Sequence, residues 1–342
     1  MKAANIAIVD PCCTRGYDPD ALNAGGLGGT EATVLRVSVA LTERTEIVHF
    51  QKGRTVSAVT TAGRMRPLED AFAAQSTSTF IVINAWKVAC KLRKVHPHAR
   101  IILWLHIHPG RHNRPMAQAL TAARVAVICV SRSHATAFRA FLRNRPLPFI
   151  DFIHNPIADD LTHDATVHDP DRLLFASSPH KGLAQVFTQF RATRDSIPNL
   201  TLAVADPGYL AWDTGPVPDG VTFLGPLPHA ALIAQMRQSL CLFYPQTTFA
   251  ETFGLVMAEA NAVGLPVLAH HDIGANAEVL GDTEQVVDGA DPDQIVARIR
   301  TWRILRPTVT AQPHFRLAAV TKRWSEQLNL SHSAGTQTEK VA

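Results

Sequence analysis

Apolar and polar positions in the first half of the chain follow two alternating periodicities. Short, mostly uninterrupted apolar runs lie at 5–10, 45–50, 79–84, 100–107 and 126–131. Such runs are typical of parallel strands that are covered on both faces. Between them, apolar residues recur at helical spacing over 30–43, 85–95 and 133–143. The pattern predicts a β/α unit with a buried parallel sheet.

The second half repeats this alternation after a polar stretch at 153–171 that contains proline and aspartate. Strand-like runs lie at 173–178, 200–206, 221–226, 240–245 and 266–270, and helical spacing occurs at 182–194, 229–239, 253–264 and 291–305. Two consecutive β/α runs of similar size predict an α/β protein with two Rossmann-like, doubly wound domains that face each other across a cleft.

The polar stretch gives the expected domain boundaries. We expect an N-terminal domain over 1–158 and a C-terminal domain over 159–306. A last amphipathic segment within 307–330 is expected to pack back on the first domain, and the polar tail 331–342 is expected to be disordered.

Composition places the chain among globular proteins. It has 342 residues, of which 46% are hydrophobic and 18% charged, so it can form substantial cores. No apolar run has the length of a membrane span. The N-terminus reads as a strand and not as a secretory signal. The five cysteines have no metal-ligand spacing, so we expect a reduced, cytoplasmic protein.

Charge is divided unevenly between the two halves. Residues 1–158 hold 20 Lys and Arg against 9 Asp and Glu, whereas 159–342 hold 13 against 20. A basic half indicates an anionic partner, such as a lipid surface on the inner face of the cell membrane or an acidic acceptor. An uneven but merely solvated surface remains an alternative. We do not expect nucleic-acid binding, because no basic patch interleaved with aromatic residues is present.

Ligands of open α/β sheets bind beyond the carboxyl ends of the strands, so the loops there hold the candidate residues. The first loop is "GGLGGTE" at 25–31, whose glycines allow close approach of an anion or sugar to the start of a helix. It is neither GxGxxG nor a P-loop. A flexible loop is the alternative interpretation.

The second loop is "WLHIHPGRHNR" at 104–114. His106 and His108 alternate along a strand, so they are not expected to form a zinc pair. His106 at a strand end is a candidate catalytic or binding group, although a structural histidine is the commoner outcome. Arg111 is expected to add positive charge on the side of an acceptor.

The third loop is "SSPHKG" at 177–182. Lys181 followed by glycine at the head of a helix suits a phosphate, because an ammonium and free helix amides act together. An ordinary surface lysine is an equally good interpretation of this loop alone.

The fourth segment, "FAETFGLVMAEANAVGLPV" at 249–267, places two glutamates in an apolar setting. Glu251 precedes a predicted helix, where the helix dipole favours a carboxylate that can accept hydrogen bonds from sugar hydroxyls. The amides of Phe253, Gly254 and Leu255 are left for a pyrophosphate, and Glu259 lies two turns further on. A capping glutamate followed by a surface glutamate is the alternative.

These segments resemble retaining glycosyltransferases of the B fold, in particular the large family 4 (glycosyl transferases group 1). "FAETFGLVMAEANAVGLPVLAHHDIGANAEVL" resembles the donor-site signature of that family, with its E-x7-E pair, its GLPV strand and a loop ending in Glu278. "SSPHKGL", "VTFLGPLPHAAL" and "IHNPI" resemble further segments of the family. The similarity is strong in the second half of the chain and weak over 40–100.

The resemblance implies roles for single residues. Glu251 would bind donor sugar hydroxyls, Glu259 the ribose, and His106 the transferring sugar near its anomeric carbon, so that His106, Lys181 and Glu251 would form the catalytic set. The donor-binding set would be Gly28, Gly29, Ser177, Lys181, Glu251, Phe253, Gly254, Leu255 and Glu259. Glu31, Arg111 and Arg132 would lie on the acceptor side.

One departure from the family concerns the diphosphate. A serine, Ser177 or Ser178, stands where the family has a phosphate-binding arginine, so Lys181 would act with less help unless Arg132 or Arg111 compensates across the cleft. The asparagine of the family's linker segment is kept as Asn155, but proline follows it in place of glycine.

Together these features predict transfer of a hexose-type sugar from a UDP-, GDP- or ADP-linked donor, with retention and without a metal or another cofactor. The expected acceptor is a sugar, lipid or cell-envelope polysaccharide. Two other hypotheses stay open. One is another activity on the same fold, such as an epimerase or a phosphorylase, and the other is a non-catalytic nucleotide-sugar sensor.

Overall fold

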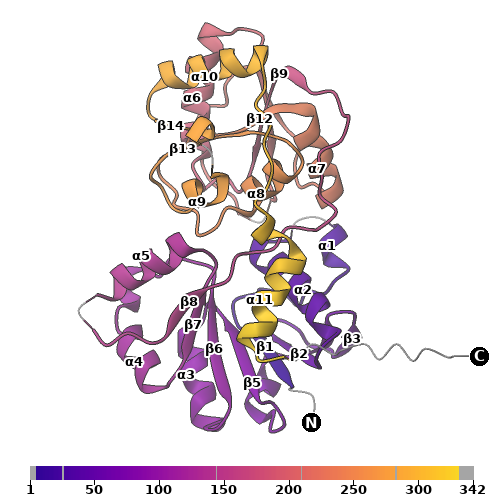
Figure 1. Cartoon of the computed structure of the whole chain (residues 1–342), viewed down its shortest axis with the longest axis vertical. Coiled ribbons are helices and arrows are strands. Elements are labelled where there is room, and N and C mark those ends of the chain that lie inside the picture. Colours follow the sequence, from indigo (N-terminus) through magenta and orange to yellow (C-terminus); the bar gives the residue numbers. More distant parts are fainter. Residues whose placement is uncertain (1–4, 25–26, 144, 209, 282, 331–342) are drawn as a thin grey trace, which may run out of the picture.

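The computed structural model describes residues 5–24, 27–143, 145–208, 210–281 and 283–330. The expected disordered tail at 331–342 and the first two glycines of 25–31 lie outside the described residues. Two parallel sheets, each with helices on both faces, stand one above the other (Figure 1). The expected α/β architecture with two Rossmann-like domains is confirmed.

The N-terminal sheet has eight strands in the order β3-β4-β2-β1-β5-β6-β7-β8. Its strands are β1 (Ile6–Asp10), β2 (Ile47–Gln51), β3 (Ala58–Thr60), β4 (Gly63–Pro67), β5 (Thr79–Ile83), β6 (Arg100–Leu105), β7 (Ala126–Cys129) and β8 (Ile150–Phe152). All neighbours pair in parallel except β3 and β4, which form a hairpin at one edge. The carboxyl ends of the central strands therefore meet at one edge of the sheet.

Helices cover both faces of this sheet because successive strand residues point to opposite sides. Ile6 and Ile8 of β1 belong to one apolar cluster with α2 (Gly29–Thr42). Ala7 and Val9 belong to another. The helices of the second face are α3 (Trp86–Val95), α4 (Met116–Ala122) and α5 (Arg132–Leu142).

The C-terminal sheet has six parallel strands in the order β11-β10-β9-β12-β13-β14. They are β9 (Asp169–Ala176), β10 (Thr201–Ala205), β11 (Val221–Phe223), β12 (Ser239–Tyr244), β13 (Val267–His270) and β14 (Val286–Val287). Its helices are α6 (Leu183–Ser196), α7 (His229–Gln238), α8 (Leu255–Ala262), α9 (Asn276–Leu280) and α10 (Pro292–Ile304). Helices α6 and α10 contact each other, and α8 contacts both α7 and α9.

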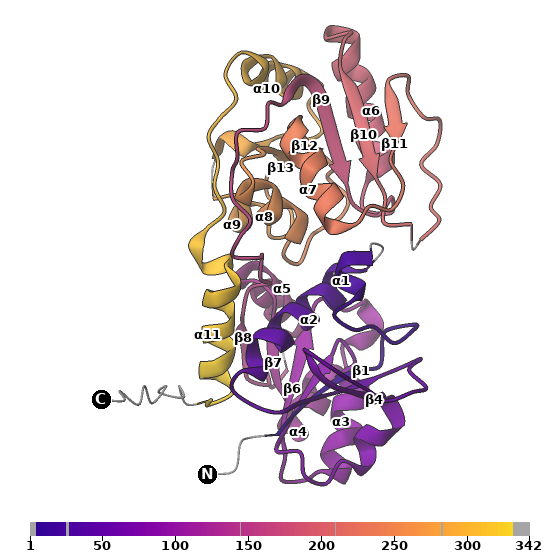
Figure 2. The same cartoon turned by 90° about the vertical axis from the view of Figure 1, so that its right-hand side faces the viewer.

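The last helix, α11 (Leu317–Gln327), returns to the N-terminal sheet and packs against α2 (Figure 1). Trp324 of α11 meets Trp104 of β6 edge-on, with ring centroids 4.6 Å apart. The two segments that connect the domains lie side by side, because Ile157 of the first forms a parallel β-bridge with Arg316 of the second. Figure 2 shows α1 (Ala21–Ala24) and α2 at the top of the N-terminal domain, facing the C-terminal one.

Several details differ from the sequence-based expectation. The β3–β4 hairpin, α4 and β8 were not anticipated, because each is short and only partly apolar. Strand β9 begins at Asp169, inside the stretch that we expected to be a linker. Strand β6 ends at Leu105, before His106. Of the described helices, none has both the length and the apolar character that a membrane span needs.

Candidate active site

The loops beyond the carboxyl ends of β1, β6, β9 and β12 line a cleft between the two sheets. The larger of two adjoining cavities in this cleft has a volume of about 1040 Å³ and is walled by both domains. The smaller cavity has a volume of about 210 Å³ and extends between α2, α7 and α8. The residues that the sequence predicts to bind a donor are distributed over the walls of both cavities. The strand ends of a doubly wound sheet converge there.

Lys181 and Glu251 form the link between the two cavities and line both. The Lys181 Nζ atom lies 2.9 Å and 3.2 Å from the two carboxylate oxygens of Glu251, and it also lies 4.9 Å from the centroid of the Phe249 ring. Glu251 is buried and accepts a further hydrogen bond from the Tyr244 hydroxyl at 3.2 Å. Burial and the nearby Glu251 charge hold the pKa of Tyr244 well above its usual range, so Tyr244 remains a donor to this carboxylate.

The backbone around Glu251 is held by a glycine from a distant loop. Gly274 has φ +57°, and a Cβ atom there would lie 2.4 Å from the Glu251 carbonyl oxygen and 2.6 Å from its amide nitrogen. The Ala275 amide donates a hydrogen bond to the same Glu251 carbonyl at 3.0 Å. This close packing fixes the direction in which the Glu251 side chain leaves the chain.

Helix α8 starts directly beside this pair. Phe253 is buried beneath it, Gly254 adopts φ +87° at the N-cap, and Leu255 opens the helix. The N-cap Gly254 has no side chain with which to cap α8. Because all three residues line the larger cavity, the positive end of the helix dipole lies at that cavity. This left-handed conformation favours glycine at position 254, because L side chains rarely adopt it.

Glu259, one of the sequence candidates, is buried at the far end of the smaller cavity. Its Oε1 atom lies 3.1 Å from Arg36 Nη1 and 2.9 Å from His229 Nε2. Burial alone would raise the pKa of Glu259, but the hydrogen bond from His229 and the charge of Arg36 outweigh it and lower that pKa. Arg36 comes from α2, so this carboxylate joins the two domains.

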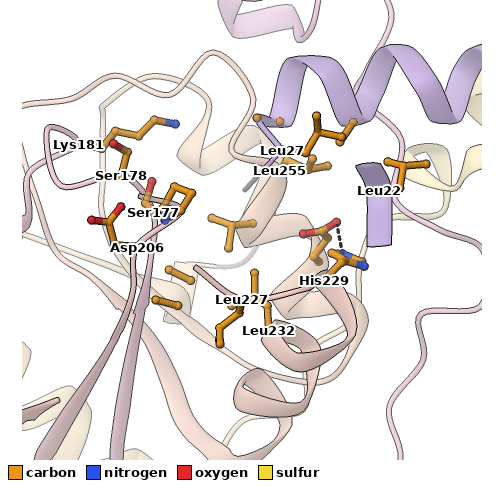
Figure 3. Close-up of a pocket in the computed structure, with 18 of the residues that line it drawn as sticks. Leu22, Leu27, Ser177, Ser178, Lys181, Asp206, Leu227, His229, Leu232 and Leu255 are labelled. Carbon is orange, nitrogen blue, oxygen red and sulfur yellow. Dashed lines mark hydrogen bonds and ion pairs between the residues drawn. The ribbon is translucent and has the colours of Figure 1, made fainter. Parts of the chain in front are cut away.

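Figure 3 shows how the smaller cavity is framed. Ser177, Ser178 and Asp206 lie on one side of it, and His229 with apolar side chains from α7 and the preceding loop lies on the other. Gly28 and Gly29 close the cavity from the N-terminal domain. A carboxylate at one end, a lysine at the other and leucines between them suit an elongated ligand with hydroxyl, apolar and anionic parts.

His106 lies across the cleft and lines the larger cavity. It is 6% exposed, and its Nε2 atom has no hydrogen-bond partner among the described residues. Its amide donates to Asn84 Oδ1 at 2.7 Å, and its carbonyl accepts from Thr252 Oγ1 at 2.8 Å. Burial, assisted by the neighbouring His134, lowers the pKa of His106 to about 3. His106 is therefore a neutral group in the cavity wall whose Nε2 atom is buried and unpaired within the described residues.

A second interdomain contact is centred on Glu278, which the sequence placed only at the end of a motif. Its carboxylate accepts hydrogen bonds from the Arg132 amide at 2.8 Å, the Ser133 amide at 2.7 Å and the Ser133 hydroxyl at 2.6 Å. His154 Nε2 lies 2.8 Å from the Oε1 atom of Glu278. Burial opposes ionisation, but these hydrogen bonds lower the pKa of Glu278 to about 2. The ionised Glu278 thus caps α5 of the opposite domain.

The arginines expected on the acceptor side lie elsewhere. Arg111 is exposed in a short 3-10 helix, and Arg132 sits over the Phe152 ring at 5.8 Å. Neither is among the residues that line the two cavities, whereas Arg15 lines the larger and Arg36 the smaller. Glu31 lines the larger cavity, where burial raises its pKa. No signal in the sequence distinguished Arg15 or Arg36 from other basic residues of the first half.

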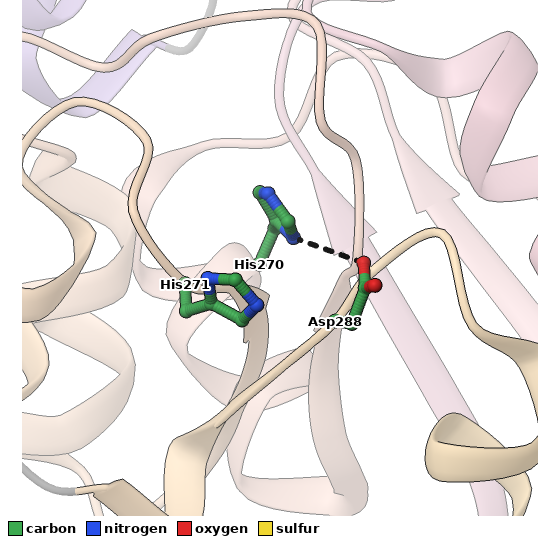
Figure 4. A group of neighbouring side chains, drawn as sticks. All are labelled: His270, His271 and Asp288. Atoms are coloured by element: carbon green, nitrogen blue, oxygen red, sulfur yellow. Dashed lines mark ion pairs between the residues drawn. The ribbon is translucent and has the colours of Figure 1, made fainter.

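A group of possible metal ligands lies at the carboxyl ends of β13 and β14 and consists of His270, His271 and Asp288 (Figure 4). Each offers a ligand atom within 4.8 Å of the others. However, Gly289 N–H donates to His270 Nδ1 at 3.0 Å, so this ring nitrogen already uses its lone pair. None of the three residues lines the two cavities of the cleft.

Comparisons with known proteins agree with this geometry. Residues 171–308 match the family described as Glycosyl transferases group 1. A D-inositol 3-phosphate glycosyltransferase from Acidothermus cellulolyticus is 36% identical over 104 residues, which cover 30% of this chain and only 22% of that relative's length.

Two solved structures share the fold over nearly the whole chain. AviGT4, a glycosyltransferase involved in avilamycin A biosynthesis, has a TM-score of 0.60 at 17% identity and covers 95% of this chain and 97% of its own. A UDP-forming α,α-trehalose-phosphate synthase from Burkholderia xenovorans has a TM-score of 0.59 at 12% identity and covers 96% and 99%. The chain therefore has the glycosyltransferase B fold, and the comparisons support a place for its C-terminal domain in glycosyl transferases group 1.

Proposed function

We propose that the protein is a retaining glycosyltransferase that moves a hexose-type sugar from a nucleotide diphosphate sugar to an anionic or membrane-associated acceptor. The observation that carries this proposal is the line formed by Lys181, Glu251 and Glu259 along one continuous cleft beside the start of α8. Glu259 and Glu251 offer hydrogen-bond partners for ribose and sugar hydroxyls, and Lys181 with the N-terminus of α8 offers positive potential for a diphosphate.

In this proposal the Lys181–Glu251 pair exchanges partners when a donor binds. Lys181 would turn from the Glu251 carboxylate to the diphosphate, and the released carboxylate would accept hydrogen bonds from sugar hydroxyls. The distances of 2.9 Å and 3.2 Å keep both groups paired until then. Such an exchange avoids leaving a buried charge alone at any stage.

The chemical step breaks the bond between the anomeric carbon and the diphosphate oxygen and forms a bond from that carbon to an acceptor oxygen. Negative charge develops on the leaving diphosphate, where Lys181 and the α8 N-terminus would stabilise it. The leaving phosphate would take the proton of the acceptor hydroxyl. Neutral His106, which lines the larger cavity, would bind the transferring sugar. Closure of the domains would exclude water.

The names of similar proteins support a uridine nucleotide in the donor but do not identify the transferred sugar. The trehalose-phosphate synthase is described as UDP-forming, and the Acidothermus relative is named for an inositol phosphate. We therefore propose a uridine diphosphate sugar as the first donor to test, followed by GDP- and ADP-linked sugars.

The test compares Lys181→Ala and Glu251→Ala with the unaltered protein. Binding of a nucleotide-sugar panel would be measured by thermal shift, and turnover by release of the nucleoside diphosphate. We expect both variants to lose at least tenfold in turnover, since each removes a charged group from the reacting centre. Lys322→Ala, which alters an exposed lysine of α11, serves as the matched control. Near-normal turnover in both cleft variants would refute the assignment.

A non-catalytic nucleotide-sugar sensor is the second candidate. The observation that favours it is the pair Ser177 and Ser178 beside Lys181, since neither serine brings a positive charge to the diphosphate. Tight donor binding without release of nucleoside diphosphate, with any acceptor, would favour the sensor.

The location of the reaction is part of the proposal. The excess of 20 Lys and Arg over 9 Asp and Glu in residues 1–158 would draw the acceptor domain to the anionic inner face of a cell membrane. A cytoplasmic enzyme of glycolipid or cell-envelope polysaccharide synthesis fits this charge. Co-sedimentation with anionic vesicles at low and high salt measures the contact.

A further inference from the structure

The wall of the larger cavity opposite the donor residues is formed by the loop 11–17, which follows β1. Thr14 and Arg15 of this loop line the cavity. Arg15 is exposed, and no carboxylate of the described residues forms an ion pair with its guanidinium. An unpaired guanidinium in a concave site is a ready partner for a planar or tetrahedral anion.

The loop is held from inside the domain by Asp10 at the end of β1. One carboxylate oxygen of Asp10 accepts the amides of Cys12 at 2.9 Å and Cys13 at 3.2 Å. The other accepts the Tyr17 hydroxyl at 2.8 Å. Both ends of the loop are therefore tied to one buried carboxylate.

The loop is held again from the neighbouring strand. Gln51 Oε1 accepts the Tyr17 amide at 3.2 Å, and Arg54 Nη2 donates to the Tyr17 carbonyl at 3.0 Å. Gly53 has φ +75°, and a Cβ there would lie 2.5 Å from the Thr14 carbonyl oxygen. The backbone that carries Arg15 is thus fixed on both sides. A ligand that binds there therefore loses little free energy to ordering of this backbone.

Other polar atoms of the same cavity also lack partners. Asn155 is 7% exposed, and its Oδ1 atom has no hydrogen bond within the described residues, as is true of His106 Nε2. Buried polar atoms are almost always satisfied in folded proteins. Both residues line the larger cavity, so its wall carries polar side chains that the described residues leave unpaired. Lys52 adds positive charge near Cys12. Burial raises the pKa of the Cys12 thiol, and the charge of Lys52 acts against that rise.

The carboxylates that line the cavity do not neutralise the positive charge of Arg15. Glu251 is paired with Lys181, and Glu31, which also lines the cavity, forms no ion pair with Arg15 within the described residues. The Arg15 guanidinium can therefore bind an anionic group of a ligand in this cavity.

We propose that Arg15 binds a phosphate or carboxylate group of the acceptor and so orients an acceptor hydroxyl toward the donor sugar between His106 and Glu251. The inference deepens the proposed function and depends on it. The anionic group has two possible sources, a soluble phosphorylated sugar or polyol and a phospholipid headgroup.

The experiment measures binding to the full-length protein and to Arg15→Gln. The soluble probes are hexose 6-phosphates, glycerol 3-phosphate and the corresponding unphosphorylated compounds. Their binding is measured by calorimetry. Membrane probes are vesicles of phosphatidylglycerol with phosphatidylcholine against vesicles of phosphatidylcholine alone. Arg145→Gln, which alters an exposed arginine of the same basic domain that lines neither cavity, is the matched control.

We expect the unaltered protein to prefer one anionic class over its neutral counterpart by about tenfold, the size of one charge-assisted hydrogen bond. Arg15→Gln should abolish that preference, and Arg145→Gln should keep it. Preference for the soluble phosphates identifies a soluble acceptor, and preference for the anionic vesicles identifies a lipid. The inference is overturned if no anionic probe is preferred, if Arg15→Gln retains the preference, or if Arg145→Gln loses as much.

Nucleotide binding separates this inference from the proposed function. Arg15→Gln should bind UDP, GDP or ADP as the unaltered protein does, because the proposed partners of the nucleotide are Lys181, Glu259 and the amides that open α8 and do not include Arg15. Lys181→Ala should bind the same nucleotide more weakly. If the unaltered protein binds no nucleoside diphosphate, the proposed function fails, whatever the anion measurements show.

Discussion

Arg36 of α2 and Glu259 of α8 form an ion pair across the domain interface, although 223 positions separate them in the chain. Their side chains are only 12% and 5% exposed, so the pair is screened little by water. His229 Nε2 shares the same carboxylate oxygen at 2.9 Å. Glu259 is therefore held ready at the end of the smaller cavity by groups from both domains.

Replacing Arg36 is expected to destabilise the protein. Arg36→Gln leaves a buried carboxylate with only His229, which should cost about 2 kcal/mol in the free energy of unfolding. Urea unfolding at neutral pH measures the change. The control is Arg64→Gln, whose partner Glu46 is 67% exposed, and it should cost less than about 1 kcal/mol. Equal effects of the two substitutions would show that the interdomain pair contributes no more than a surface pair.

Gly274→Ala is expected to disturb Glu251 without touching the cleft itself. The new Cβ would meet the Glu251 backbone at 2.4 Å and 2.6 Å, so that backbone must move. Gly215→Ala is a matched control, because Gly215 also has a positive φ, of +70°, with no atom within 4 Å of a Cβ. The control should cost about 1 kcal/mol for its conformation.

Gly274→Ala should cost about 1–3 kcal/mol beyond the control, because it also forces atoms into a packed site. It should weaken nucleotide-sugar binding as well, since the direction of the Glu251 carboxylate changes. Unfolding curves and thermal shifts with donor, measured side by side, check both effects. Donor binding that stays normal in Gly274→Ala would separate Glu251 from the donor site.

Glu278→Gln is expected to weaken the contact between α9 and α5. The folded-state pKa of Glu278, about 2, lies below the value of 4.5 for a free glutamate. Its ionised form therefore stabilises the fold fully above pH 4.5, and that contribution is lost as pH falls toward 2. At pH 7 the substitution should cost about 2 kcal/mol, because charge-assisted hydrogen bonds to Ser133 and His154 are lost.

Two measurements check the Glu278 prediction. The stability difference between Glu278→Gln and the unaltered protein should narrow as pH is lowered from 4.5 toward 2. Glu69→Gln, an exposed glutamate of the N-terminal domain, should change the unfolding free energy by less than about 0.5 kcal/mol. A difference that is independent of pH would mean that the charge of Glu278 is unimportant.

Stability should fall between pH 7 and pH 5 because of buried neutral histidines. Burial lowers the pKa of His49 to about 4 and those of His106 and His134 to about 3, against 6.5 when unfolded. The unfolded chain then binds more protons than the folded one, so unfolding becomes easier as pH drops below 6.5. Each histidine should lower the free energy of unfolding by on the order of 2 kcal/mol at pH 5.

Urea unfolding at both pH values measures this loss. His49→Gln keeps a donor for the Ala62 carbonyl, which His49 Nε2 contacts at 3.1 Å, and it removes one titrating group. The variant should therefore lose less stability between pH 7 and pH 5 than the unaltered protein. An identical loss in both would exclude His49 as a source of the acid sensitivity.

Local sequence patterns determined much of the architecture. Uninterrupted apolar runs identified strands such as β1, β6 and β12, and helical spacing identified helices such as α2 and α6, because the burial of each element depends on residues that are close together in the sequence. The edge hairpin β3–β4 was not predicted, because most of its residues are only partly buried or exposed and they form no continuous apolar run. Loops after the strands led to Lys181, Glu251 and Glu259, all of which line the cleft.

Only the tertiary structure decided how these residues are partnered. Arg36 reaches Glu259, and Glu278 caps α5 from 146 positions away. Arg15 lines the larger cavity, while Arg111 lines neither cavity. One sequence contains many basic residues that look alike, and which of them meets a carboxylate or a cavity depends on how the two domains pack. The sequence by itself determined most of the strands and helices and the acidic pair, because those depend on near neighbours. The partners of the charges depend on distant segments, so they were decided by the fold.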